Sequence, residues 1–338
     1  MSLAEIAQQI VGPQKGVLAA DESSPTIKKR FDSINVESTE DMRRFYREML
    51  FRTEAAAPYI GGVILFDETL RQNAADGTPL AKVLTDQGIV PGIKVDKGAK
   101  ALAGAEGETV TEGLDGLRER LAEYFELGAR FTKWRAVIKI TDVLPSRYCI
   151  EANAHALARF AKLTQEAGMV PIVEPEVLMN GTHTIERCAE ATEATLVEVY
   201  HQLSIHRVEL EGTLLKPNMI VSGDECPVQA DAEQVAAMTV QTLSRTVPGA
   251  VPGIVFLSGG LSEVDATRNL NAMNRLGPHP WELSYSFGRA LQASALKAWG
   301  GSEENHAAGQ AAYAHRARCN GMARTGDYSD AIEGGATA

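Results

Sequence analysis

The sequence predicts an α/β fold, a closed (β/α)8 barrel. Short apolar runs alternate with helix-like segments along most of the chain, which is typical of parallel strands joined by crossover helices. Eight such units can be counted, the number that closes a barrel, and 338 residues suit a single barrel domain. An open doubly wound sheet is the alternative, but no Gly-x-Gly-x-x-Gly follows the first strand.

The expected elements follow this alternation in order. Strands are predicted at Gly16–Asp21, Gly62–Phe66, Gly92–Asp96, Phe131–Ile140, Met169–Val177, Thr213–Val221, Gly253–Gly259 and Glu282–Gly288. Helices are predicted at Met1–Ile10, Thr39–Thr53, Leu80–Gly88, Gly113–Leu127, Ser146–Ala167, His183–Leu203, Ala230–Thr246, Ser262–Met273, Arg289–Trp299 and Glu303–Cys319. One domain is therefore expected over residues 1–323. The end of the chain, 324–338, is rich in small and polar residues and is expected to be a flexible tail.

Composition excludes several function classes. The net charge of −11 argues against general nucleic-acid binding, and no apolar run is long enough to cross a membrane. The four cysteines stand far apart and no signal peptide is evident, so reduced thiols in a cytoplasmic protein are expected. No pair of the seven histidines has ligand spacing, which leaves a metal-dependent mechanism poorly supported and predicts no metal or other cofactor.

Lys216 is the most informative single residue. It lies in the apolar run Leu214-Leu215-Lys216-Pro217-Asn218, which is typical of a buried strand. Burial favours the neutral form of a lysine amine, and a neutral amine attacks ketones to give Schiff bases. A lysine at a strand end with its head in water is the structural alternative, and for a lone lysine it is the better one.

Other strands also end in charged residues. Residues two apart on a strand share a face, so Glu174 points the same way as Glu176, and Lys133 the same way as Arg135. Asp21 closes the first strand, and Lys94 and Asp96 end the third. Each alone could be a solvated carboxylate or an ion pair, but together they place ionisable groups on the rim where barrels carry their active sites.

These residue types suit cleavage of a carbon–carbon bond beside a carbonyl. Lys133 near Lys216 would favour the neutral amine through like-charge repulsion. The pair Glu174 and Glu176 could share a proton, which would raise one of their pKa values toward neutrality. An iminium on Lys216 would accept the electrons that the broken bond releases.

Two late turns indicate a phosphate site. Ser258-Gly259-Gly260 leads into a helix, whose backbone N–H groups could hold an anion, and Ser286 and Arg289 follow at the next strand end. Either turn alone is usually just a tight turn. Ser23 and Arg30, after the first strand, could serve a second phosphate, although a solvated basic helix is the alternative there.

Together these segments resemble class I fructose-bisphosphate aldolase from about Gly16 to Ala323. The most specific pieces are Leu18-Ala19-Ala20-Asp21-Glu22-Ser23, Lys133-Trp134-Arg135, Val173-Glu174-Pro175-Glu176, Glu211-Gly212-Thr213-Leu214-Leu215-Lys216-Pro217-Asn218, Phe256-Leu257-Ser258-Gly259-Gly260 and Gly288-Arg289-Ala290-Leu291. The resemblance implies reversible cleavage of fructose 1,6-bisphosphate in glycolysis and gluconeogenesis, without a metal, by a homotetramer.

The resemblance also implies residue roles. Lys216 would form the Schiff base and Glu174 would be the main acid and base, with Glu176 assisting it. Lys133 would polarise substrate oxygens, and Asp21 would order the site and help with the proton of the C4 hydroxyl. Ser258, Gly259 and Arg289 would bind the C1 phosphate, Arg30 and Lys94 would serve the C6 phosphate, and Arg135 would support both ends. Gly260, Ser286 and Ser23 are expected to be further substrate- or phosphate-binding residues.

Two positions depart from the family pattern. Animal members end in a tyrosine that assists proton transfer to the enamine, whereas this chain ends in Ala338, and Tyr328 lies about ten residues inside. Phe287 stands where animal members have tyrosine. Two other functions stay open at this stage: a phosphosugar isomerase that uses Glu174 as a base without covalent catalysis, and a non-catalytic scaffold that binds other proteins.

Overall fold

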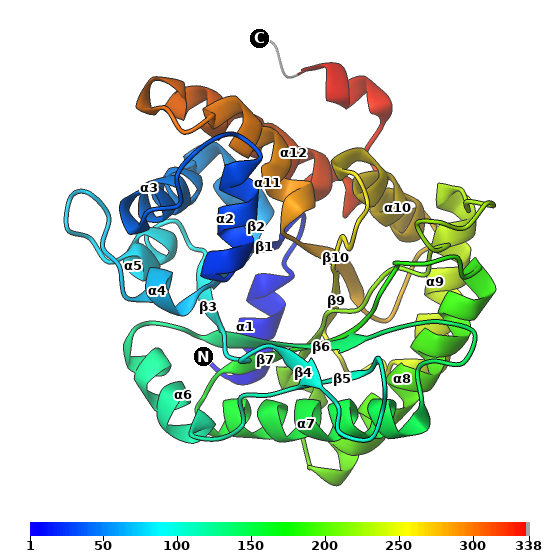
Figure 1. Cartoon of the computed structure of the whole chain (residues 1–338). Coiled ribbons are helices and arrows are strands. Elements are labelled where there is room, and N and C mark those ends of the chain that lie inside the picture. Colours follow the sequence, from blue (N-terminus) through cyan, green and yellow to red (C-terminus); the bar gives the residue numbers. More distant parts are fainter. Residues whose placement is uncertain (336–338) are drawn as a thin grey trace.

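Eight parallel strands close into a barrel in the computed structural model, which describes residues 1–335. The strands follow one another around the barrel in the order β1, β10, β9, β8, β7, β6, β3, β2. In Figure 1 they form the centre of the molecule and the helices surround them. The prediction of a closed (β/α)8, or TIM, barrel is confirmed, and the open doubly wound sheet is wrong. The barrel strands are β1 Gly16–Ala20, β2 Ile60–Leu65, β3 Val90–Lys94, β6 Phe131–Ile138, β7 Val170–Val177, β8 Leu214–Leu215, β9 Gly253–Phe256 and β10 Glu282–Phe287.

The helices between the strands largely match the predicted segments. They are α1 Leu3–Ile10, α2 Ser24–Asp32, α3 Glu40–Phe51, α4 Asp67–Leu70, α5 Leu80–Thr85, α6 Leu117–Glu126, α7 Arg147–Glu166, α8 Ile185–Ile205, α9 Ala232–Thr246, α10 Glu263–Arg275, α11 Arg289–Trp299 and α12 His306–Ala323. Side chains of Ser146, Thr184 and Ser262 cap the amino ends of α7, α8 and α10 by accepting a backbone N–H bond. These caps explain why the helices begin where the sequence indicated.

Strand β8 is much shorter than the predicted strand Thr213–Val221. The backbone N–H of Lys216 still bonds to the carbonyl of Val173 on β7, at 2.8 Å. Pro217 then has no N–H to donate. Beyond Pro217, a side chain takes the place of the backbone hydrogen bonds between strands: Asn218 Oδ1 accepts the N–H of Val177 at 3.1 Å. The chain therefore stays beside β7 after Lys216 without being a regular strand.

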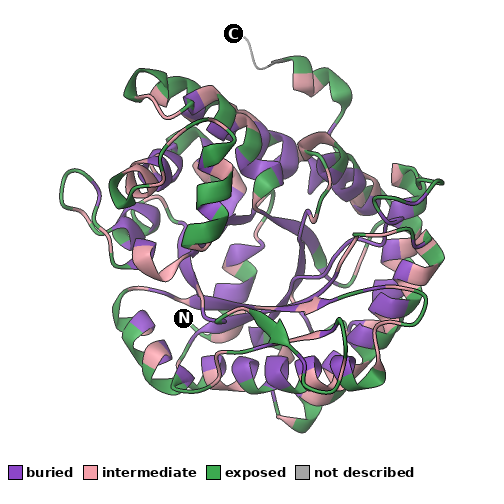
Figure 2. Cartoon of the chain, in the orientation of Figure 1, coloured by how far each residue is buried: buried purple, intermediate pink, exposed green. Residues whose placement is uncertain are grey.

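Helices α2 and α4 were not among the predicted helices, and an antiparallel hairpin of β4 Ala99–Ala101 and β5 Thr109–Thr111 was missed as well. The hairpin lies in the connection between β3 and β6. Strand β4 is exposed at all three positions, so it carries none of the apolar pattern that marked the barrel strands. Figure 2 shows it as an exposed surface strand.

Helix α1 closes the amino end of the barrel. Its buried residues Ile6, Ala7 and Ile10 belong to one apolar cluster with barrel residues such as Val17 and Val90. In Figure 1 the helix is seen through the barrel. A Cβ atom at Gly61 would lie 1.9 Å from the backbone oxygen of Ile10, so this close approach requires glycine. The interior of the barrel is therefore filled at this end, and the charged cavity described below opens at the carboxyl end.

The segment after α12 first packs on the barrel and then on helices α10 and α12. The side chain of Arg324 donates to the backbone oxygen of Val11 at 2.6 Å, and Tyr328 is buried. A 3-10 helix, η4, follows at Asp330–Gly335. The boundary at residue 323 and the mobility of the tail stay predictions, and residues 336–338 lie outside the described part of the chain. No helix among residues 1–335 combines the length and the apolarity needed to cross a membrane.

Candidate active site

A cavity of about 340 Å³ opens at the carboxyl end of the barrel. All of the predicted site residues except Gly260 line it. They come from different strands and loops: Asp21, Ser23, Arg30, Lys94, Lys133, Arg135, Glu174, Glu176, Lys216, Ser258, Gly259, Ser286 and Arg289. The tertiary structure therefore brings together residues that are spread over most of the sequence.

Four ionisable groups of alternating charge form the centre of the site. Asp21 Oδ2 lies 2.7 Å from Lys133 Nζ, and the same ammonium lies 3.2 Å from Glu174 Oε2. Glu174 Oε1 lies 3.1 Å from Lys216 Nζ. The side chains of Lys133, Glu174 and Lys216 are at most 5% exposed. The row Asp21–Lys133–Glu174–Lys216 thus links β1, β6, β7 and the end of β8.

Strand register explains why these groups meet. Lys133 and Arg135 are two apart on β6 and share its inner face, as the period of a strand requires. Arg135 pairs with Glu174 across β6 and β7, and Lys94 pairs with Lys133 across β3 and β6. A shift of one residue in either pairing would turn the charged side chains out of the barrel.

Neighbouring charges set the ionisation of the row. Burial alone would raise the pKa of Asp21, but the cations of Lys133 and Lys216 lower it by more, so the pKa lies well below its ordinary value. The pKa of Glu174 is lowered in the same way, with burial outweighed by Lys133 and Lys216. Burial would lower the pKa of Lys133, but Asp21 and Glu174 raise it above its ordinary value. At neutral pH the site therefore contains two carboxylates on either side of a fixed ammonium.

This geometry corrects two sequence-based expectations. Glu174 lies between Lys133 and Lys216 and offsets the predicted like-charge repulsion between them. Glu176 is bound by the guanidinium of Arg135, whereas Glu174 is held by the lysines. The sequence suggested that the two carboxylates share a proton and that one of their pKa values is raised. In the free enzyme the pKa of Glu174 is instead lowered, so the two do not share a proton in this way.

Lys94 is held by a residue that was not among the predicted site residues. Its Nζ lies 3.1 Å from Oδ1 of buried Asp96, which also accepts the backbone N–H of Gly98 at 3.1 Å. The other oxygen, Oδ2, accepts the N–H of Arg135 at 3.3 Å. Asp96 thus fixes the loop that follows β3. Asp96 was expected on the rim beside Lys94, but no role in the site was predicted for it.

The two glycine-containing turns meet at one end of the cavity. Arg289, the first residue of α11, donates from Nη2 to the carbonyl oxygen of Gly259 at 2.6 Å. Ser286 Oγ is buried and has no hydrogen-bond partner among the described residues. A buried hydroxyl without a partner is a group that an incoming anion could satisfy. Gly260 differs from the prediction, because its N–H donates to Met179 Sδ at 2.8 Å and it does not line the cavity.

The next part of the cavity wall begins at the amino end of α2, which follows β1, the strand beside β10. Ser23 Oγ and Thr26 Oγ1 lie 3.1 Å apart there, and both residues line the cavity. Arg30, one turn further along α2, pairs with buried Glu22. Arg47 of α3 donates to the backbone oxygen of Glu22 at 2.8 Å and is itself 1% exposed. Glu22 lines the cavity, and Arg47 supports it from behind. Both were missed because their strand or helix pattern does not distinguish them from surface charges.

Comparison with known proteins gives the family. A profile described as "Glycolytic: Fructose-bisphosphate aldolase class-I" matches residues 2–338. The chain belongs to the class I fructose-bisphosphate aldolase family. As a member of this family it cleaves fructose 1,6-bisphosphate reversibly into dihydroxyacetone phosphate and glyceraldehyde 3-phosphate through a lysine Schiff base. Family membership therefore rules against the two alternatives that the sequence left open, a phosphosugar isomerase and a non-catalytic scaffold.

Several aldolases resemble the chain over nearly its whole length. It is 56% identical to a probable class 1 fructose-bisphosphate aldolase of Xanthomonas campestris, with 96% of this chain and 98% of that protein covered. It is 57% identical to a cytosolic fructose-bisphosphate aldolase of Arabidopsis thaliana, covering 95% of this chain and 90% of that one. A solved aldolase of Plasmodium falciparum, crystallised with TRAP and a small-molecule inhibitor, superposes with a TM-score of 0.96 at 49% identity, covering 97% of this chain and 95% of that chain.

Proposed function

We propose that Lys216 is the residue of this aldolase that forms the Schiff base with the C2 ketone of fructose 1,6-bisphosphate. The observation that supports it best is the contact of Lys216 Nζ with Glu174 Oε1, at 3.1 Å. Both side chains are almost completely buried at the centre of the cavity. A carboxylate beside an amine can move the protons that imine formation requires.

Lys216 and Glu174 carry the first half of the reaction. The amine of Lys216 attacks C2, and the ketone oxygen gains a proton, which gives a carbinolamine. The carboxylate of Glu174 first takes a proton from the nitrogen of Lys216, from which it is 3.1 Å away. It then delivers this proton to the C2 hydroxyl, water leaves, and the C2–N bond becomes an iminium. Lys133 and Glu176 support this step, since Lys133 polarises substrate oxygens and Glu176 lines the same cavity while paired with Arg135.

Asp21 takes part in the cleavage step. It lies 2.7 Å from Lys133 Nζ and lines the cavity, where it helps to remove the proton of the C4 hydroxyl. The C3–C4 bond then breaks, C4 becomes the aldehyde carbon of glyceraldehyde 3-phosphate, and the bonding electrons pass through C3 to the iminium nitrogen. The resulting enamine is protonated at C3 and hydrolysed to dihydroxyacetone phosphate. Tyr328 is buried against Glu333, and it does not line the cavity, so it is not assigned to the C3 proton transfer.

The two ends of the cavity suit the two phosphates. Ser258, Gly259, Ser286 and Arg289 are assigned to the C1 phosphate, at the open amino end of α11, and Gly260 contributes only by shaping the turn. Ser23, Lys94 and Arg30 are assigned to the C6 phosphate, and Arg135 between them serves both ends. Arg30 also lies beside Gly288, since its Nη2 is 3.4 Å from the point where a Cβ of that glycine would be. It is therefore within reach of the C1 end as well.

Three further properties are proposed because they are general in this family. Catalysis needs no metal, because the iminium on Lys216 accepts the electrons that a metal would otherwise stabilise. The enzyme is a homotetramer. It works in the cytoplasm, as do the two plant relatives named as cytosolic or cytoplasmic isozymes.

Borohydride trapping tests the assignment of Lys216. Reduction of the enzyme with dihydroxyacetone phosphate should leave a stable adduct on the peptide that carries Lys216, detected by mass spectrometry. The variant Lys216→Met should give no adduct and lose activity by on the order of 10⁴-fold or more. Lys82→Met, which replaces an exposed lysine of α5, is the matched control and should keep both. An active Lys216→Met enzyme, or an adduct on another lysine, would contradict the assignment.

A further inference from the structure

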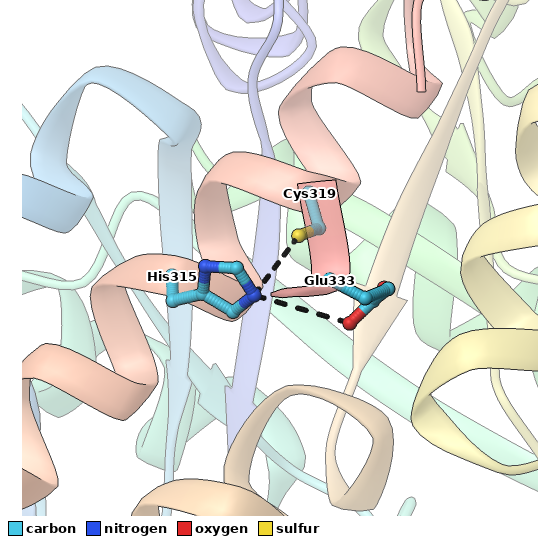
Figure 3. Close-up of side chains that lie close together, drawn as sticks. All are labelled: His315, Cys319 and Glu333. Atoms are coloured by element: carbon cyan, nitrogen blue, oxygen red, sulfur yellow. Dashed lines mark hydrogen bonds and ion pairs between the residues drawn. The ribbon is translucent and has the colours of Figure 1, made fainter. Parts of the chain in front are cut away.

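We propose that His315, Cys319 and Glu333 form a zinc-binding site that fastens the end of the described chain to helix α12. His315 and Cys319 are four residues apart on α12, so they lie one above the other on one face of the helix. Glu333 comes from η4, fourteen positions after Cys319, and folds back against this face. Figure 3 shows the three side chains converging on one point.

The distances between the donor atoms suit a single metal ion. Cys319 Sγ lies 3.6 Å from His315 Nε2, and that nitrogen lies 3.9 Å from Glu333 Oε2. All three donor atoms lie within 4.8 Å of one another. Zinc bonds of about 2.0 Å to nitrogen and about 2.3 Å to sulfur, at a tetrahedral angle, separate the two ligand atoms by about 3.5 Å. The histidine and cysteine are therefore already spaced as zinc ligands, and the carboxylate of Glu333 would have to move closer to His315 by about half an ångström.

The donor types favour zinc over other common cations. A thiolate, an imidazole and one carboxylate form a mixed set that zinc binds, whereas magnesium and calcium prefer oxygen ligands alone. Three protein ligands leave a fourth position for water. Cys319 is fully buried, while the side chains of His315 and Glu333 are 17% and 21% exposed, so the ion can enter from the solvent side.

Neighbouring groups hold the carboxylate ligand in place. Arg316 donates to both oxygens of Glu333, at 2.8 Å and 2.6 Å, and the hydroxyl of Tyr328 donates to Oε1 at 2.5 Å. Hydrogen bonds from outside the coordination sphere commonly orient carboxylate ligands. The positive charge of Arg316 offsets part of the negative charge that Glu333 and a Cys319 thiolate would gather there. Arg316 weakens zinc binding through repulsion, but it also fixes the direction of the ligand.

Zinc binding has to remove the proton of Cys319. A metal ion displaces the thiol proton on coordination. At neutral pH the enzyme should therefore release one proton for each zinc ion bound, and the affinity should rise with pH.

The site is separate from the catalytic cavity. None of its three ligands lines that cavity, so the ion has no part in breaking the C3–C4 bond. Its effect is mechanical, because it adds a second link between η4 and α12 beside the pair formed by Arg316 and Glu333. Cleavage without a metal is compatible with it. Failure of either proposal would leave the other standing.

Cobalt(II) is the probe for this site, since it replaces zinc in tetrahedral sites and is coloured. The full-length enzyme, first treated with a chelator, is titrated with cobalt(II) in the presence of a thiol-free reductant. We expect one equivalent to produce a thiolate-to-cobalt charge-transfer absorption together with the visible bands of tetrahedral cobalt, and zinc to displace them. Zinc should also raise the melting temperature, with proton release measured by calorimetry in buffers of different ionisation enthalpy.

Matched variants decide whether the three residues are the ligands. Cys319→Ser and His315→Gln should lose the charge-transfer absorption and the zinc-dependent rise in melting temperature, while keeping aldolase activity. Cys226→Ser, which changes another buried cysteine, should keep both signals. No charge-transfer band in the unaltered enzyme, or a band of equal strength in Cys319→Ser, would overturn the proposal. Tyr328→Phe keeps all three ligands, and we expect it to weaken zinc binding by about tenfold.

Discussion

The carboxylate of Glu174 contacts the amine of Lys216, with 3.1 Å between Oε1 and Nζ. Its other oxygen faces Lys133, and Lys133 in turn faces Asp21. A proton acceptor therefore lies within reach of the atom that attacks the substrate, and it stays ionised because two cations surround it. The same carboxylate both orients the nucleophile and is placed to exchange protons with it.

Glu174→Gln should separate these two functions. The amide keeps the shape of the side chain but loses the negative charge and the ability to transfer protons. We expect kcat to fall by about 10²- to 10⁴-fold, the range for removal of a general acid or base. Because Lys216 is intact, the borohydride adduct should still form, but more slowly. Quench-flow measurement of adduct formation checks this, and an unchanged rate of adduct formation would exclude Glu174 from imine chemistry.

Asp21→Asn should reduce the loss of stability that the enzyme shows at acid pH. The pKa of Asp21 is lowered in the folded protein, so its contribution to stability is complete above its ordinary value of about 3.9 and is lost as the pH falls through the folded value. The melting temperature of the parent enzyme should therefore fall more steeply than that of Asp21→Asn between about pH 4 and pH 2. Asp32→Asn, at an exposed pair with Lys28, is the control and should follow the parent curve. Parallel curves for the parent and Asp21→Asn would contradict the prediction.

Arg289→Lys tests the phosphate end of the cavity. The guanidinium of Arg289 donates to the carbonyl of Gly259 and also faces the cavity. A lysine ammonium lacks the planar set of donors that allows one group to make both contacts. Losing a hydrogen bond to a charged group costs about 1.5–3 kcal/mol, so kcat/KM should fall by about 10- to 100-fold. Steady-state kinetics with fructose 1,6-bisphosphate measure this. Borohydride trapping of the variant at saturating substrate should still label Lys216; if trapping failed as well, Arg289 would act on the imine and not on the phosphate.

Gly61→Ala should disturb the contact between α1 and the barrel. The added Cβ would lie 1.9 Å from the backbone oxygen of Ile10, and backbone cannot yield as a flexible side chain would. Overpacking of this kind costs about 1–3 kcal/mol or more, so the free energy of unfolding should fall by at least that amount. Gly249→Ala is the control, since its Cβ would meet only Pro280 at an ordinary 3.5 Å. Equal denaturant midpoints for the two variants would show that α1 does not close the barrel as described.

Much of the site could be predicted because strand geometry is regular. Lys133 with Arg135, and Glu174 with Glu176, share a face for the same reason in any strand. That these faces turn toward the interior of the barrel follows once the barrel is expected. The exceptions have local causes. Gly260 turns its N–H to Met179, a contact between residues 81 positions apart that no local pattern indicates.

Residues that act through other residues were not predictable in this way. Glu22 and Arg47 are buried behind Arg30, but in the sequence they look like ordinary charges at a strand end and on a helix. The spacing of His315 and Cys319 is visible in the sequence, but Glu333 joins them only when the chain turns back after α12. Long-range contacts of this kind depend on how helices pack, and periodicity carries no information about that.

The sequence by itself determined the barrel, the order of its strands along the chain and the inward direction of the catalytic side chains, because alternation and apolar periodicity are local properties. Only the tertiary structure decided which charges become partners. Closing the barrel places Glu174 between Lys133 and Lys216, and it pairs Glu176 with Arg135. The protonation of a buried group depends on atoms within a few ångströms of it, and those atoms come from strands far apart in the sequence.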